Sequence, residues 1–72
     1  MKSTDDLVRI AAAGGGLDLR NGNKSTDDLV RIAAAARNKG GRILIRGDGK
    51  STDDLVRIAA AGHGCVTIYF AQ

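Results

Sequence analysis

The hydrophobic and polar positions of this chain follow one twelve-residue pattern that is written three times. The peptide Lys-Ser-Thr-Asp-Asp-Leu-Val-Arg-Ile-Ala-Ala-Ala occurs letter for letter at residues 2–13, 24–35 and 50–61. In each copy the leucine, the isoleucine and the first alanine lie at i, i+3 and i+4, the spacing of one apolar face on an α-helix. The pattern predicts three amphipathic helices, and self-similarity at this period indicates a repeat architecture.

Each predicted helix also has a start signal. An aspartate follows the serine of every copy at the capping-box spacing of three residues, and the paired aspartates place negative charge in the first turn. The candidate N-caps are Ser3, Ser25 and Ser51. Arg9 lies four residues after Asp5, so we expect an ion pair along the outer surface of each helix.

The three copies end differently. Glycines at 14–16 follow the first copy and Gly62 follows the third, and both predict helix C-termini. The second copy continues through residues 36–39 to Gly40, which predicts a helix about one turn longer than the others.

A strand-like run follows each predicted helix. Residues 17–20 and 42–46 alternate between apolar and polar side chains, and residues 65–70 are rich in β-prone residue types. Turn residues at 21–23 and 47–49 then lead into the next helix. The order is helix, strand, helix, strand, helix, strand, which requires parallel strands joined by right-handed crossovers.

The alternation within these runs predicts a sheet that is covered on one face only. Doubly wound parallel sheets are buried on both faces and read as continuous apolar runs, and these runs do not. The apolar face would hold Leu17, Leu19, Ile43, Ile45, Val66, Ile68 and Phe70. The opposite face would hold Asp18, Arg20, Arg42, Leu44, Arg46, Thr67 and Tyr69. We therefore expect an α/β fold in which all helices cover one face of a three-stranded parallel sheet, with the strands in sequential order, as in a short solenoid. Its units would be residues 2–23, 24–49 and 50–72 of a single domain, residues 1–72.

Length and composition narrow the expected functions. A chain of 72 residues forms one domain at most, and much of its 43% hydrophobic content is alanine, so we expect marginal stability for a monomer. The single cysteine, Cys65, excludes a disulfide within the chain and reads as a small hydrophobe at the start of a strand rather than a nucleophile. There is no signal-peptide, membrane-spanning or lipidation pattern, so we expect a soluble protein, cytoplasmic if it is made in bacteria.

Nothing in the sequence indicates catalysis, a metal or a cofactor. His63 is the only histidine and lies between two glycines, and a single histidine does not make a metal site, so it reads as a loop residue. No nucleophile is placed beside a base. We expect neither an enzyme nor a bound cofactor.

The net charge of +3 comes from outside the copies, in which one lysine, one arginine and two aspartates cancel. Three arginines, Arg20, Arg42 and Arg46, fall on the expected bare face of the sheet. They allow two interpretations, a weak nucleic-acid or polyanion surface and a solvated face whose charges discourage edge pairing. The near absence of aromatic residues favours the second interpretation, because sheets that bind nucleic acid stack bases on aromatic side chains.

One turn resembles the tail of a phosphate-binding P-loop, G-x-x-x-x-G-K-[ST]. Gly49, Lys50 and Ser51 match its end, after a strand and before a helix, and Gly47 lies in the same turn. The first glycine of the motif falls on Leu44, and aspartates at 48, 53 and 54 lie where a phosphate would bind. The resemblance implies a phosphate or nucleotide site as the alternative to capped helix starts.

The identity of the three copies indicates how the sequence arose. Natural repeats diverge because many surface substitutions are nearly neutral, so identical copies indicate an engineered or very recently duplicated repeat protein.

The run Val66 to Phe70 is uncharged and holds both aromatic residues, and we expect it at a sheet edge that nothing covers. The candidate self-association residues are Val66, Ile68, Tyr69 and Phe70. The favoured function is a non-catalytic scaffold that forms a homodimer by antiparallel pairing of two such strands, and exchange of whole repeats between chains is the other route to association.

Overall fold

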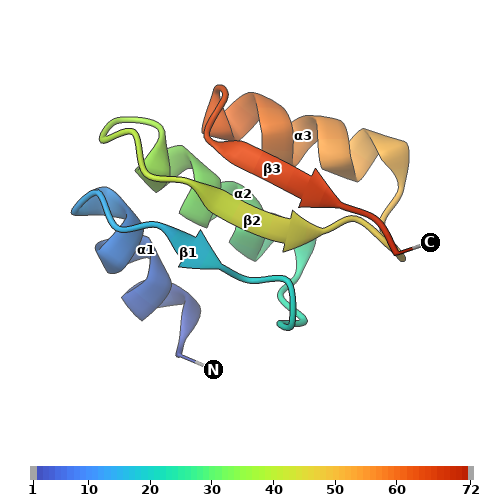
Figure 1. Ribbon diagram of the computed structural model, residues 1–72, viewed down its shortest axis with the longest axis horizontal. Helices are drawn as coiled ribbons and strands as arrows, with labels where there is room; N and C mark the ends of the chain where they lie inside the picture. Colours follow the sequence, from blue (N-terminus) through green and yellow to red (C-terminus); the bar gives the residue numbers. More distant parts are fainter. Residues whose placement is uncertain (1, 72) are drawn as a thin grey trace.

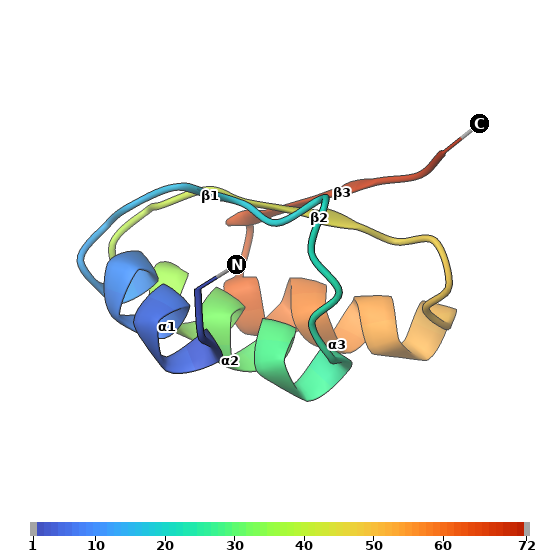
Figure 2. The same ribbon diagram turned by 90° about the horizontal axis from the view of Figure 1, so that it is seen from below.

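The computed structural model describes residues 2–71 and contains three helices and three strands in alternation (Figure 1). In chain order these are α1 (Thr4–Ala12), β1 (Leu17–Asp18), α2 (Thr26–Ala36), β2 (Ile43–Arg46), α3 (Thr52–Gly62) and β3 (Val66–Tyr69). The sheet is parallel, with Leu17 beside Ile43 and Ile43 beside Val66, and its order is β1-β2-β3. Figure 2 shows all three helices beneath the same face of this sheet. The predicted α/β class, the sequential strand order and the bare sheet face are confirmed.

Each copy of the peptide forms one helix, and each helix starts as predicted. The hydroxyls of Ser3, Ser25 and Ser51 accept hydrogen bonds from the backbone N–H three residues on, at 3.2, 3.2 and 3.1 Å. These bonds satisfy one of the backbone donors that a helix start leaves without an internal partner. The shared start sequence thus explains why all three helices begin at the same position of the copy.

Three predicted boundaries were wrong. Helix α2 ends at Ala36 and is not one turn longer, because residues 37–40 form the turn that leads the chain up to the sheet. Strand β1 covers only residues 17–18, since the Asp18 carboxylate accepts the Arg20 N–H at 3.1 Å and bends the chain. Strand β3 ends at Tyr69, so Phe70 lies beyond it.

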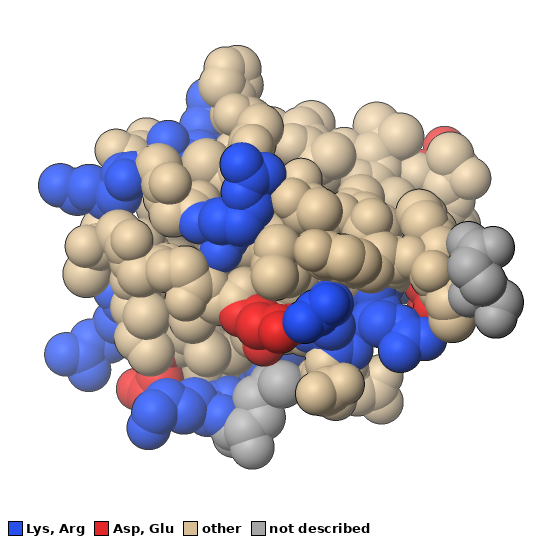
Figure 3. Space-filling view, viewed as in Figure 1, with Lys and Arg blue, Asp and Glu red and all other residues tan. Residues whose placement is uncertain are grey.

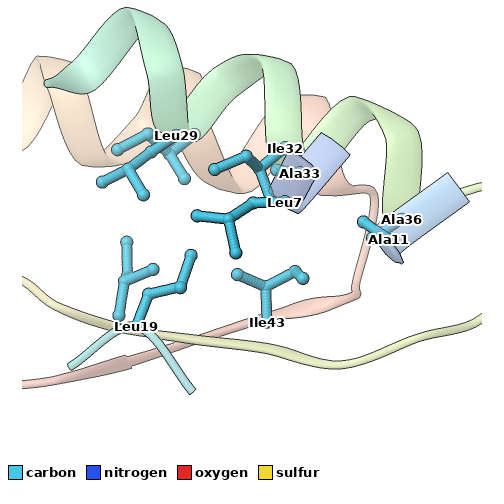
Figure 4. Packing of buried hydrophobic residues seen from close by; sticks show 10 residues of the cluster. Leu7, Ala11, Leu19, Leu29, Ile32, Ala33, Ala36 and Ile43 are labelled. Atoms are coloured by element: carbon cyan, nitrogen blue, oxygen red, sulfur yellow. The ribbon is translucent and has the colours of Figure 1, made fainter. Parts of the chain in front are cut away.

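The core lies between the helices and the sheet. Leu19 and Ile43 point from the sheet toward Leu7, Leu29 and Ile32 on the helices (Figure 4). Its largest fully buried side chains are all isoleucines: Ile32, Ile43, Ile45 and Ile58. Larger apolar residues at the strand and helix faces therefore form the core, while alanines such as Ala11 and Ala33 let the layers approach closely.

The same peptide is buried differently at its three places in the helix layer. Helix α2 lies between α1 and α3 (Figures 1 and 2). Ile32 of α2 is 0% exposed, whereas the corresponding Ile10 of α1 is 37% exposed. On the other side of the layer, Val56 of α3 is 59% exposed. None of the helices within residues 2–71 is both long and apolar enough to span a membrane.

Candidate functional site

The turn that resembles a P-loop tail is held by contacts within the protein. Ser51 caps α3 by accepting the Asp54 N–H. The Lys50 ammonium group donates to the Lys24 carbonyl and the Thr26 hydroxyl, both at 3.3 Å, and so joins this turn to the start of α2. Its two hydrogen bonds point the lysine toward the neighbouring helix rather than into an empty loop.

The backbone of this turn explains why glycine occurs at positions 47 and 49. Gly49 has a φ of +83°, a left-handed conformation that glycine adopts without strain. A Cβ atom on Gly47 would lie 2.5 Å from the Phe70 ring, so the ring packs directly on this backbone. The Asp48 carboxylate accepts the Ala71 N–H at 2.9 Å and a bond from Arg46 at 2.8 Å. Both contacts lower the pKa of Asp48, the Ala71 N–H having the larger effect.

A small hollow lies beside this turn, at the carboxyl ends of β1 and β2. Its volume is about 180 Å³, and its lining includes Lys24, Arg46, Asp48 and Lys50. Ligands of open α/β sheets bind at this edge. The hollow brings Gly49 and Lys50 of the predicted phosphate site to its wall, while Gly47 and Ser51 are not part of the lining.

The arginines of the bare sheet face are largely paired. Arg20 donates to the Asp18 carboxylate at 2.7 Å, and Arg46 donates to Asp48 at 2.8 Å. Hydrogen bonds from the Arg20 side chain lower the pKa of Asp18 to about 2. In Figure 3, which looks onto this face, an acidic side chain lies beside basic ones near the middle. Local carboxylates therefore reduce the positive potential that a polyanion would meet.

Two further contacts organise this face. Arg42, the residue before β2, donates to the Thr67 hydroxyl of β3 at 2.9 Å. The Arg20 guanidinium lies 4.7 Å from the centre of the Tyr69 ring, a cation–π contact between the turn after β1 and the end of β3. One face of the Tyr69 ring thus already has a cationic partner within the same chain.

The predicted self-association residues are brought together at one edge of the sheet. Tyr69 is 40% exposed and Phe70 is 56% exposed, while Val66 and Ile68 are half-buried against the core. The carbonyl group of Cys65 accepts a bond from Ile43 of β2, and that of Tyr69 accepts one from Gly47, which follows β2. Because backbone groups in a parallel strand alternate between its two neighbours, those of Val66, Ile68 and Phe70 face away from β2. This outer edge of β3 has no strand beside it within residues 2–71.

A row of ion pairs between helices is the feature that sequence reasoning missed. Arg31 of α2 pairs with Asp5 of α1 at 2.8 Å, and Arg57 of α3 pairs with Asp27 of α2 at 3.1 Å. The predicted pair of Asp5 with Arg9 is therefore wrong, because Asp5 instead pairs with Arg31 of the next helix. The charges were visible in the sequence, but their partners depend on how far one helix is displaced along the next.

His63 and Cys65 have structural positions. His63 ends α3 in the left-handed conformation, with a φ of 50°, and its N–H donates to the Ala59 carbonyl. Cys65 is half-buried, and its thiol lies 3.8 Å from the Ala36 carbonyl. Residues 2–71 contain no group of three or more histidine, cysteine or acidic side chains that could hold a metal ion.

Comparison with known proteins adds no relative: no family model, curated protein or solved structure matches this chain.

Proposed function

We propose that this chain is a non-catalytic α/β repeat scaffold, engineered or recently duplicated, whose units stack as in a short solenoid and which associates with other copies of itself. The proposal is supported first by the equivalence of the contacts between successive copies. An arginine–aspartate pair joins α1 to α2, and the same two positions of the copy join α2 to α3. Repeat proteins are stabilised by such nearest-neighbour interfaces.

The observation that carries self-association is the exposed edge of β3. The edge presents the outward backbone groups of Val66, Ile68 and Phe70, and the last of these keeps 56% of its surface exposed. An uncharged edge strand of this kind is a template for another strand. A partner that pairs there would satisfy the backbone groups and remove apolar surface from water.

The direct test is the solution mass, measured by light scattering on a sizing column across a dilution series at low and high salt. We expect association that strengthens with concentration and changes little with salt, because it rests on backbone pairing and apolar burial. A monomer at every concentration would refute the scaffold's self-association.

A sharper variant removes a single hydrogen-bond donor. Native chemical ligation at Cys65 joins residues 1–64 to a synthetic peptide 65–72 that carries an N-methyl group on Ile68. The side chain is retained, and the lost N–H is one that faces away from β2, so we expect an intact fold and loss of association. N-methylation of Thr67, whose backbone faces β2, is the matched control and should unfold the sheet instead.

The alternative is a phosphate, nucleotide or nucleic-acid binding module. The observation in its favour is the hollow at the carboxyl ends of the strands, with Lys24 and Lys50 in its lining. Binding of inorganic phosphate or of a short single-stranded DNA should then be detectable by calorimetry, should weaken steeply as salt is raised, and should fall in a Lys50→Ala variant. A titration that gives no heat of binding even at low salt would rule out the binding module.

A further inference from the structure

The two outer faces of the helix layer are complementary to each other. α1 exposes the side that α2 turns toward α1, and α3 exposes the side that α2 turns toward α3. On α1 this side contains Ile10, at 37% exposure, beside Arg9, and on α3 it contains Val56, at 59%, with Asp53 nearby. The interior of the protein shows how these two kinds of surface fit, because α2 presents one to each neighbour.

The surface on α1 is hollowed. A shallow depression of about 430 Å³ is lined by Lys2, Asp6, Arg9, Ile10 and Ala13. The corresponding isoleucine of α2, Ile32, is 0% exposed because α1 packs over it. The depression on α1 is therefore equivalent to the surface of α2 that α1 covers.

The charges match in the same way. Within the chain, the arginine of each later copy pairs with the first aspartate of the copy before it. Among residues 2–71, Arg9 and Asp53 are the members of this row that have no ion pair. Placing α3 of one copy against α1 of another would pair Asp53 with Arg9 and continue the row.

We propose, on the basis of the self-association proposed above, that the partner of the β3 end is the β1 end of a second copy of this chain. The chains would stack head to tail, α3 on α1 and β3 beside β1 in parallel, so that each junction repeats the contacts between successive copies. A two-fold pairing of β3 with β3 would instead place α3 of one chain against α3 of the other. In that arrangement Asp53 does not meet Arg9, and Val56 does not meet the depression on α1.

The strand layer contributes part of the junction. The Leu17 and Leu19 N–H groups donate to β2, so the backbone groups of Gly16, Asp18 and Arg20 face outward toward the incoming β3. One of these donors, the Arg20 N–H, is already held by the Asp18 carboxylate at 3.1 Å. The helix layer therefore sets the direction of stacking, and the strands add the remaining backbone bonds.

Head-to-tail contact does not close on itself at two copies, which separates it from a two-fold dimer. We expect the unmodified chain to form a series of masses that extends past the dimer as concentration rises. Ile10→Glu should block one face and Val56→Glu the other, so each variant alone should be monomeric. An equal mixture of the two variants retains one good junction and should give a 1:1 dimer and nothing larger.

A control variant and two contrary outcomes complete the test of head-to-tail stacking. Asn38→Glu, in the exposed turn after α2, adds the same charge and should associate as the unmodified chain does, and circular dichroism checks that each variant is folded. A dimer that does not grow and that survives Ile10→Glu would overturn head-to-tail stacking while leaving the scaffold's self-association intact. Monomers at every concentration of the unmodified chain would overturn both.

A second measurement tests the ion pair without placing a new charge in the interface. Arg9→Ala and Asp53→Ala should each weaken association by about two- to five-fold, as exposed ion pairs do. The double variant should be no weaker than either single variant, because the two side chains share one contact. Effects that multiply would show that Arg9 and Asp53 do not meet, and would overturn the proposed register.

Discussion

The centre and the ends of the helix layer have the same sequence and different surroundings. In α2, which has a neighbour on each side, Leu29, Ile32, Ala33 and Ala36 are all buried. In α1 the buried residues are Leu7 and Ala11, and in α3 they are Ile58 and Gly62. The positions of Leu7 and Ala11 are thus buried in α1 and α2, and the positions of Ile58 and Gly62 are buried in α2 and α3. Only the central helix buries all four positions, because only it has a neighbour on both sides. The comparison separates what a sequence specifies locally from what its place in the layer adds.

The isoleucine of the copy gives the largest expected effect. Ile32→Ala should lower the free energy of unfolding by about 2–5 kcal/mol, because the side chain is fully buried and leaves a cavity. Ile10→Ala, at a position 37% exposed, should lower it by less than about 1.5 kcal/mol. Urea unfolding at a concentration where the chain is monomeric measures both.

A milder substitution at the same position provides the control for that pair. Where Ile32→Ala is already unfolded in water, Ile32→Val removes one methylene and should lower the free energy of unfolding by about 0.5–1.5 kcal/mol. Equal losses at positions 10 and 32 would contradict the difference in burial between the outer and central helices.

The helix caps provide a smaller test, because here the three copies are alike in structure. Ser25→Ala removes the hydroxyl that accepts the Asp28 N–H at 3.2 Å and should lower the free energy of unfolding by about 1 kcal/mol. Ser3→Ala removes an equal bond at 3.2 Å, but the first turn of α1 is free to fray alone, so its effect on global unfolding should be smaller.

Hydrogen exchange locates the effect of each cap. Ser3→Ala should speed amide exchange only in the first turn of α1, whereas Ser25→Ala should speed exchange in α1, α2 and the sheet together. Equal and purely local changes in both variants would mean that the central helix is no more coupled to the rest of the fold than the outer one.

Most of the fold was predictable from local pattern, and the parts that were not depend on neighbours. The capped starts at Ser3, Ser25 and Ser51 follow from the copy itself, and the alternation within the strands fixed which face would be bare. The end of α2 did not follow, because residues 37–39 have ordinary helix propensity, and the chain turns there and brings Gly41 against the Gly15 carbonyl. The partners of the arginines did not follow either, because they depend on the displacement between stacked helices.

The sheet repeats the contrast between centre and edge, and gives the smallest test. At the position where the central strand has Leu44, β1 has Asp18, whose carboxylate binds the Arg20 side chain and its backbone N–H. These bonds lower the pKa of Asp18 from 3.8 to about 2. Because the pKa is lower in the folded chain than in the unfolded chain, the ionised pair stabilises the fold above about pH 4, and this contribution is lost as the pH falls toward 2.

Asp18→Asn isolates this contribution from that of the other carboxylates. The variant should be less stable than the unmodified chain at neutral pH, by a constant amount down to about pH 4. The gap should shrink as the pH falls toward 2 and close below about pH 2, where the aspartate is protonated in the folded chain as well and resembles asparagine. Urea unfolding of both chains at a series of pH values measures the gap. A gap that does not change between pH 6 and pH 2 would show that the shape of the Asp18 side chain, and not its charge, accounts for its effect on stability.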